Sequence, residues 1–305
     1  MRIILGQPHS FCQAGKRDYQ EDSRFPDTDK PERNTPFFLV CDGVGGCEKG
    51  EMASKTVCDA FHAILSRTHW EEPFTEKSFQ MALDHAYDSL QQISNDSNRG
   101  MATTLAFAAF HSNGCTVAHI GDSRVYHVRP SEGILYRSDD HSLVNFLVHS
   151  GNLTPEEAID HPNSNVITRC INIPDEGEER AAATVMQIKD IAIGDYVFLC
   201  SDGVLHTLTD HDLLAILSSA DTDEEKMSQI AERSKESEDN NTAILIPITE
   251  VQPDNDFDDM EYPIPENSGT NTVTFIRKPE QTREVKSYQK QTLGNKICIF
   301  FKKLF

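Results

Sequence analysis

Hydrophobic residues recur along residues 37–248 with two different spacings, which distinguish helices from strands. Two segments place apolar residues three or four positions apart, the spacing that gathers them on one face of a helix. Their apolar positions are Ala53, Val57, Ala60, Phe61, Ile64 and Leu65 in the first segment, and Phe79, Leu83, Ala86, Tyr87, Leu90 and Ile93 in the second. The pattern predicts two consecutive amphipathic helices.

Short apolar runs bounded by turn residues predict strands. They cover residues 37–41, 104–110, 115–120, 124–128, 196–200 and 243–248. Three of these runs follow closely on one another, separated by Ser112-Asn113-Gly114 and by Gly121-Asp122, which are typical turn residues. We therefore expect an antiparallel meander in this part of the chain.

Shorter helices are predicted over residues 142–149 and 212–217. Another helix is expected to start after Thr154, because threonine caps a first turn, Pro155 fits its first position and Glu157 completes a capping box. This order of elements fits helices packed on mainly antiparallel sheets better than a parallel alternation. The predicted fold class is α+β.

Composition narrows the class of protein. The chain has 305 residues, which is long enough for one domain of roughly 250 residues and an extension. Its apolar content of 38% is typical of a globular protein. The formal net charge of −21 argues against nucleic-acid binding, because a phosphate backbone would be repelled. The eight cysteines are scattered without a Cys-x-x-Cys pair. We therefore expect them to be reduced and to pack as small apolar side chains, and not to form disulfides or bind zinc. No run reaches the roughly 20 apolar residues of a membrane span, so we expect a cytoplasmic protein.

The composition changes after residue 250, which predicts a domain over residues 1–250 and a flexible extension over residues 251–305. Residues 251–276 hold six acidic residues and no lysine or arginine, whereas residues 277–305 hold eight basic and two acidic ones. Residues 296–305 combine apolar side chains with lysines. This end of the chain either contacts an anionic membrane or a partner, or frays or folds back on the domain.

Candidate chemistry begins with two aspartate-glycine pairs that directly follow predicted strands. Asp42-Gly43 follows residues 37–41, and Asp202-Gly203 follows residues 196–200. A carboxylate at the end of a buried strand places a hard oxygen ligand at the rim of a sheet, and the glycine lets the backbone approach a bound ion.

Further carboxylates are available to the same site. They are Glu21, Asp22, Asp122 and Asp239. Taken alone, each of them could be an ordinary acidic residue of a turn or loop. Together with the two aspartate-glycine pairs they predict a magnesium- or manganese-type centre, since hard divalent cations prefer carboxylate and carbonyl oxygens.

Residues 10–248 resemble the metal-dependent protein phosphatase family of the protein phosphatase 2C type, in particular its compact bacterial members. The resemblance lies in seven motifs that occur in the family order. They are residues 17–22, Asp42 to Gly46, Met101-Ala102-Thr103-Thr104, Gly121 to Arg124, residues 141–169, Ser201-Asp202-Gly203 and Asp239 to Thr242. The resemblance implies that residues 1–250 are a catalytic domain with a four-layer α-β-β-α sandwich, two antiparallel sheets flanked by helices.

The resemblance also implies the reaction, hydrolysis of phosphoserine or phosphothreonine in proteins by a hydroxide bridged between two Mn²⁺ or Mg²⁺ ions. By this resemblance Asp42 bridges the two ions and the Gly43 carbonyl binds the second one. Asp202 and Asp239 bind the first ion.

The same resemblance implies roles for the other site residues. Glu21 and Asp22 hold water bound to the second ion, and Arg17 binds the phosphate, for which a planar guanidinium is suited. Asp122 joins Asp202 at a third, weaker metal site, or is an ordinary hairpin carboxylate. Thr103 and Thr104 are interpreted as structural support.

Three positions depart from the family pattern. Val44 stands where eukaryotic members have a histidine proposed as general acid, which predicts a weaker reaction with poor leaving groups. Gln20 replaces an asparagine and Ala102 a glycine, and neither change removes a metal ligand. In the flap region, residues 141–169, no catalytic role is assigned, and His141 is expected to hydrogen-bond locally beside Asp140.

The expected partners are phosphorylated proteins, a serine/threonine kinase that shares those targets and no nucleic acid, with the chain itself a monomer. Two other functions stay open. One is a catalytically weak regulatory module of the same fold that binds phosphoproteins, and the other is a membrane-localised signalling adaptor that uses residues 296–305.

Overall fold

The computed structural model describes residues 1–44, 48–95, 100–159, 161–175, 177–252 and 300–301. All of them belong to one compact unit, which takes in Met1–Pro253 and Cys298–Phe305. Gly45 and Gly46 of the first aspartate motif lie outside the described residues, as does most of the expected extension.

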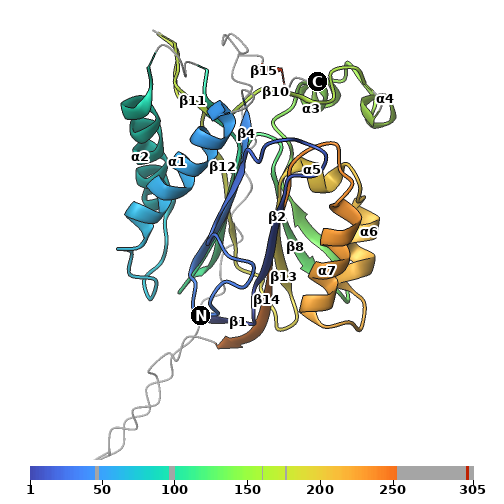
Figure 1. Ribbon diagram of the computed structural model, residues 1–305. Helices are drawn as coiled ribbons and strands as arrows, with labels where there is room; N and C mark the ends of the chain where they lie inside the picture. Colours follow the sequence, from blue (N-terminus) through green and yellow to red (C-terminus); the bar gives the residue numbers. More distant parts are fainter. Residues whose placement is uncertain (45–47, 96–99, 160, 176, 253–299, 302–305) are drawn as a thin grey trace, which may run out of the picture. The chain divides into compact units, whose positions relative to one another are not determined.

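Two antiparallel sheets form the centre of this unit (Figure 1). The first sheet has the order β1-β14-β13-β8-β9, with β2 also paired to β14. Its strands are β1 (Arg2–Leu5), β2 (His9–Gln13), β8 (Arg124–Arg129), β9 (Gly133–Arg137), β13 (Tyr196–Cys200) and β14 (Asn241–Gln252).

The second sheet has the order β11-β5-β4-β6-β7-β12, with β3 also paired to β4. Its strands are β3 (Asp22–Phe25), β4 (Phe37–Val44), β5 (Ala102–Thr103), β6 (Leu105–His111), β7 (Gly114–Ile120), β11 (Ile171–Asn172) and β12 (Thr184–Ile188). Only the first half of the expected meander is present: β6 pairs with β7 across the turn at residues 112–113, but β8 does not pair with β7 and instead pairs with β13 and β9. The chain then crosses from β7 to β8 in the first sheet.

Helices cover the outer faces of both sheets. Figure 1 shows α1 and α2 on one side of the paired sheets, and α5, α6 and α7 on the other. The helices are α1 (Glu48–Leu65), α2 (Glu76–Ile93), α3 (Leu143–His149), α4 (Pro155–Ile159), α5 (Asp202–Leu205), α6 (Asp210–Leu217) and α7 (Asp223–Ser234). Both predicted amphipathic helices are present, and Thr154 and Glu157 form the expected capping box at α4.

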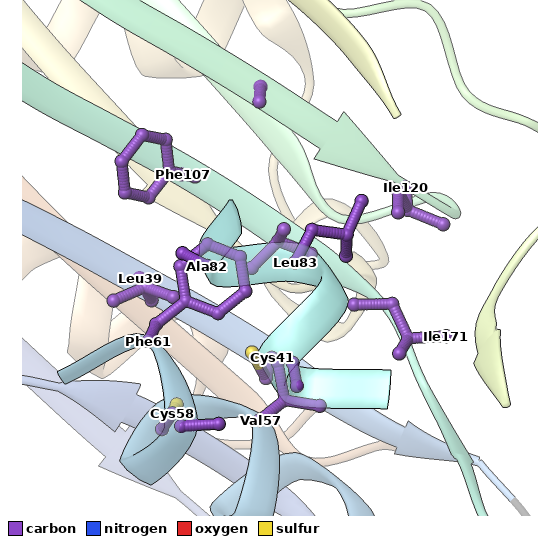
Figure 2. Packing of buried hydrophobic residues seen from close by; sticks show 14 of the residues in the cluster. Leu39, Cys41, Val57, Cys58, Phe61, Ala82, Leu83, Phe107, Ile120 and Ile171 are labelled. Atoms are coloured by element: carbon purple, nitrogen blue, oxygen red, sulfur yellow. The ribbon is translucent and has the colours of Figure 1, made fainter. Parts of the chain in front are cut away.

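Alternation along β4 separates two hydrophobic layers, because successive side chains of a strand point to opposite faces. Leu39 and Cys41 pack with Phe61 and other residues of α1 and α2 (Figure 2). Phe38 and Val40 instead belong to the cluster between the sheets.

A third apolar cluster lies between the first sheet and helices α5, α6 and α7, and includes Phe198, Ile216 and Ile230. Together with the two clusters at β4, this gives three hydrophobic layers between four layers of secondary structure. The predicted α-β-β-α sandwich is confirmed.

Two described residues near the C-terminus, residues 300–301, pair with a strand of the domain. Residues Phe300–Phe301 form β15, which pairs antiparallel with β10 (Val166–Ile167). Ile167 and Phe300 are partners in the register, as are Val166 and Phe301. For these two residues the structure therefore agrees with folding back, one of the alternatives left open for residues 296–305.

Candidate metal centre

Three carboxylates meet at one rim of the sandwich. Asp42 lies near the end of β4, Asp122 lies in the turn between β7 and β8, and Asp202 is the first residue of α5, just after β13. One oxygen of each carboxylate lies within 4.8 Å of the others. Asp42 is 6% exposed and Asp122 7% exposed. Of the six carboxylates that the sequence assigned to one site, the structure brings the oxygens of these three within this distance.

The arrangement fits a hard divalent cation. Like charges that are close together and largely buried destabilise one another, and a cation between them removes that repulsion. Carboxylate oxygens are also the ligands that Mg²⁺ and Mn²⁺ prefer. The donor set and its geometry therefore agree with a metal centre.

Backbone bonds fix Asp42 in place. Its carbonyl accepts hydrogen bonds from Thr104 N and Thr103 Oγ1, both at 2.9 Å. Its own N–H donates to Thr104 Oγ1 at 3.0 Å. Thr104 Oγ1 lies 2.6 Å from Ser123 Oγ, next to Asp122. The two threonines thus support the site through the backbone, as the sequence interpretation proposed.

Glu21 and Asp22 lie beside the first aspartate-glycine pair. The Glu21 carbonyl accepts from Gly43 N at 3.1 Å, and Asp22 stands opposite Asp42 in the pairing of β3 with β4. Burial raises the pKa of the Glu21 carboxyl, and the nearby carboxylate of Asp239 raises it further, against the opposing effect of Arg17. A bound cation would favour the ionised form of this group.

Arg17 and Asp239 form an ion pair at the same rim. Arg17 Nη2 donates to Asp239 Oδ2 at 3.1 Å, and Arg17 Nε donates to the Glu238 carbonyl at 3.0 Å. Asp239 is not among the three carboxylates that lie within 4.8 Å of one another. Its other oxygen accepts from Asn240 N at 2.9 Å.

Ser201 has a positioning role that the sequence analysis did not assign. It is fully buried, and its hydroxyl donates to Asp22 Oδ2 at 2.8 Å while accepting from Thr242 N at 2.9 Å. It therefore ties Asp22 to β14 across the site. Its place directly before Asp202 was the available signal.

The sequence also contained no indication of the structural role of Asn240. Its Nδ2 donates to the carbonyls of Ala14 and Tyr19, both at 2.9 Å. Its Oδ1 accepts from Glu21 N at 2.8 Å. One buried amide thus holds both ends of the loop that carries Arg17 and Glu21.

His141 makes longer-range contacts than the local bond expected from the sequence. Its Nδ1 accepts from Gly121 N at 3.2 Å, and its backbone N–H donates to the Gly121 carbonyl at 2.9 Å. Its ring stacks on His119 with centroids 4.4 Å apart. Burial lowers the pKa of His141 to about 3, with further contributions from His119 and Arg169. A neutral ring is what acceptance at Nδ1 requires, so His141 links the flap to the turn of Asp122.

The Val44 side chain has an apolar environment. It is buried and belongs to a small apolar cluster with Ala102, Ile167 and Cys170. Since Ile167 lies in β10, this cluster joins the flap to the strand that carries Asp42.

The chain is similar to bacterial protein phosphatases in sequence and structure. Residues 21–240 match the family model described as Protein phosphatase 2C. The protein phosphatase PhpP of Streptococcus pneumoniae is 33% identical over 196 residues, which cover 60% of this chain and 73% of PhpP.

Solved structures agree with this likeness. The serine/threonine phosphatase PstP/Ppp of Mycobacterium tuberculosis superposes with a TM-score of 0.69 at 26% identity, covering 81% of this chain and 100% of that one. The catalytic domain of PstP in complex with two manganese ions gives a TM-score of 0.65 at 25% identity, again over 81% of this chain and 100% of that one.

Proposed function

The chain belongs to the protein phosphatase 2C family and is a metal-dependent protein serine/threonine phosphatase, and we propose that Asp42, Asp202 and Asp239 hold its two catalytic ions. In this proposal Asp42 would hold both ions, and the Gly43 carbonyl would help to hold the second. Asp202 and Asp239 bind the first ion.

One observation carries the assignment of Asp42 and Asp202, the approach of the Asp42, Asp122 and Asp202 carboxylates to within 4.8 Å of one another in a largely buried rim. Asp239 lies outside this group, and its part in the proposal follows from the family resemblance. When bound, the ions would neutralise charge on the phosphoryl group and lower the pKa of a water molecule. Asp122 and Asp202 are proposed to hold a third ion.

The remaining site residues are proposed to position the second ion and the substrate. Glu21 and Asp22 would hold water at the second ion. The Ser201 hydroxyl, which donates to Asp22 Oδ2, would keep that carboxylate in position. Arg17 binds the phosphate of the substrate. A guanidinium has five N–H donors, and its bonds to Glu238 and Asp239 use two of them. The others stay available for phosphate oxygens.

Removal of metal tests the function directly. We expect the protein to release phosphate from a phosphothreonine peptide in the presence of Mn²⁺ or Mg²⁺, and to lose this activity when a chelator removes the ions. Restoring Mn²⁺ should restore the rate. Phosphate release is followed colorimetrically, and the metal content is measured in the same samples. Full activity in protein shown to be free of metal would contradict the proposal.

A regulatory module of the same fold is the alternative that this experiment separates. Such a module would bind a phosphothreonine peptide without releasing phosphate under any metal condition. The set of buried carboxylates favours the enzyme, because binding a phosphoprotein by itself does not require them.

We propose that the substrates are proteins phosphorylated by a serine/threonine kinase, and that the phosphatase is a monomer in the cytoplasm. Sedimentation measures the oligomeric state. Among the described residues, no helix is long and apolar enough to cross a membrane.

Residues 296–305 are proposed to make a peripheral contact with an anionic membrane or a partner, since lysines flank their apolar residues. Because β15 pairs with β10, such contact would need this strand to leave the domain. We expect the full chain to sediment with anionic vesicles, and a chain lacking residues 290–305 to stay in the supernatant. Equal sedimentation of both would contradict this contact.

A further inference from the structure

Tyr19 presents an aromatic ring to solvent between two residues of the site. Its exposed fraction is 65%, and it lies two positions after Arg17 and two before Glu21. Isolated exposed apolar side chains are common on protein surfaces. The position of Tyr19 is different, because it lies only two residues from Arg17, the residue proposed to bind the phosphate, in the same loop.

The backbone that carries Tyr19 is held on several sides. The Tyr19 carbonyl accepts from Asn240 Nδ2 at 2.9 Å, and the Asn240 Oδ1 accepts from Glu21 N at 2.8 Å. At the other end of the loop, Lys16 N donates to the Ser237 carbonyl at 2.9 Å. Because the backbone is already fixed, a ligand that binds the ring does not have to order the loop as well.

The charges around Tyr19 favour a cationic ligand. Both basic side chains of the loop already have acidic partners, since Lys16 Nζ lies 2.6 Å from Glu238 Oε1 and Arg17 is paired with Asp239. The neighbouring residue, Asp18, is exposed and adds a negative charge to the loop. An aromatic face attracts a lysine or arginine side chain, and no basic side chain of this loop competes for it.

We propose that Tyr19 binds the side chain of a lysine or arginine that flanks the phosphorylated residue, so that the enzyme prefers basic phosphosites. The inference rests on the proposed function, in particular on Arg17 as the residue that receives the phosphate. It makes Tyr19 a specificity-determining residue outside the set of metal ligands.

Peptide kinetics test this inference. An alanine-rich phosphothreonine peptide is made with one arginine, placed in turn at each of the three positions before and after the phosphothreonine. For at least one position we expect the wild type to show a KM about three- to fivefold lower than for the all-alanine peptide, the size of a cation–π contact near an exposed site. Tyr19→Ala should lose this preference with little change in kcat, and Tyr19→Phe should keep most of it.

Ile193 supplies a matched control. It is 67% exposed and lies before β13, at the end of that strand away from Ser201. Ile193→Ala should keep the arginine preference of the wild type.

Three results would overturn the inference. The first is an arginine preference that Tyr19→Ala retains. The second is a KM that Tyr19→Ala raises equally for arginine and alanine peptides, which indicates a merely structural role. The third is a leucine peptide that binds as well as the arginine peptide, which indicates apolar contact without charge recognition. Turnover of p-nitrophenyl phosphate by the wild type tests the proposed function separately, because that substrate has no flanking residue.

Discussion

Replacing Asp42 with asparagine is expected to lower manganese-dependent phosphate release by at least about a thousandfold. The substitution keeps the size of the side chain, and the bonds of the Asp42 backbone to Thr103 and Thr104 are unaffected. It removes one negative charge from the group that approaches within 4.8 Å. Metal ions contribute several kcal/mol of transition-state stabilisation, and each 1.36 kcal/mol corresponds to about a tenfold change in rate.

Stability measurements distinguish a ligand from a structural residue. In metal-free protein, Asp42→Asn should leave the melting temperature equal or higher, because it relieves repulsion between buried carboxylates. Added Mn²⁺ should stabilise the wild type and have little effect on the variant, since only binding to the native state raises stability.

Asp190→Asn is the control for Asp42→Asn. Asp190 is 85% exposed and pairs with Arg129 on the surface, so both its rate and its response to Mn²⁺ should match the wild type. A rate for Asp42→Asn within tenfold of the wild type would contradict the role proposed for Asp42.

The sequence was most informative where hydrophobic pattern and local chemistry agree. β13 occupies the predicted residues 196–200, since all five side chains are buried in the sheet. The helix start at Thr154 depends only on neighbours in the chain, and the structure has it as predicted. The same kind of signal was present and overlooked at α7, where Thr222 and Glu225 form a capping box.

Strand β3 was missed because its residues are Asp22, Ser23, Arg24 and Phe25. Their pattern is polar, and their strand conformation comes from pairing with the buried β4. Arg24 is buried there with Ser10 and Asp29 as hydrogen-bond partners. Local propensity is overridden by such tertiary pairing, which sequence spacing does not reveal.

In the candidate site, too, local sequence signals predicted some features, whereas others depend on tertiary contacts. The strand ends predicted that Asp42 and Asp202 lie at the rim of a sheet, and the structure brings their carboxylates together with that of Asp122. The pairing of Arg17 with Asp239 joins residues far apart in the sequence, and Asn240 is an ordinary turn residue until its contacts with Ala14 and Tyr19 are known. The roles of the individual ligands stay predictions.

Gly203→Ala is expected to combine a loss of stability with a loss of activity. A Cβ at this buried position would overlap the Asn240 carbonyl oxygen and lie 2.9 Å from its carbon. Ser237 Oγ also bonds to the Gly203 carbonyl at 2.8 Å, so the loop of residues 237–240 has little room to adjust. Overpacking of this kind costs about 3 kcal/mol, which lowers the melting temperature of a domain of this size by about 10 °C.

Activity should fall further than stability alone explains. The displaced loop carries Asp239, the partner of Arg17, and Asn240, which holds the backbone of Tyr19 and Glu21. Below its melting temperature the variant should therefore stay folded by circular dichroism and show weakened Mn²⁺ binding and a reduced rate.

Gly100→Ala separates steric overlap from the general cost of replacing a glycine. Gly100 has φ +91°, and, apart from its neighbours in the chain, no atom of the described residues lies within 4 Å of the position that an alanine Cβ would take. Alanine there costs only backbone strain, about 1–2 kcal/mol, and leaves the rate unchanged. If Gly203→Ala loses no more stability than Gly100→Ala and retains full activity, the contact of Gly203 with Asn240 does not maintain the site. If it loses both, the close approach of α5 to this loop is what holds Asp202 and Asp239 at one rim.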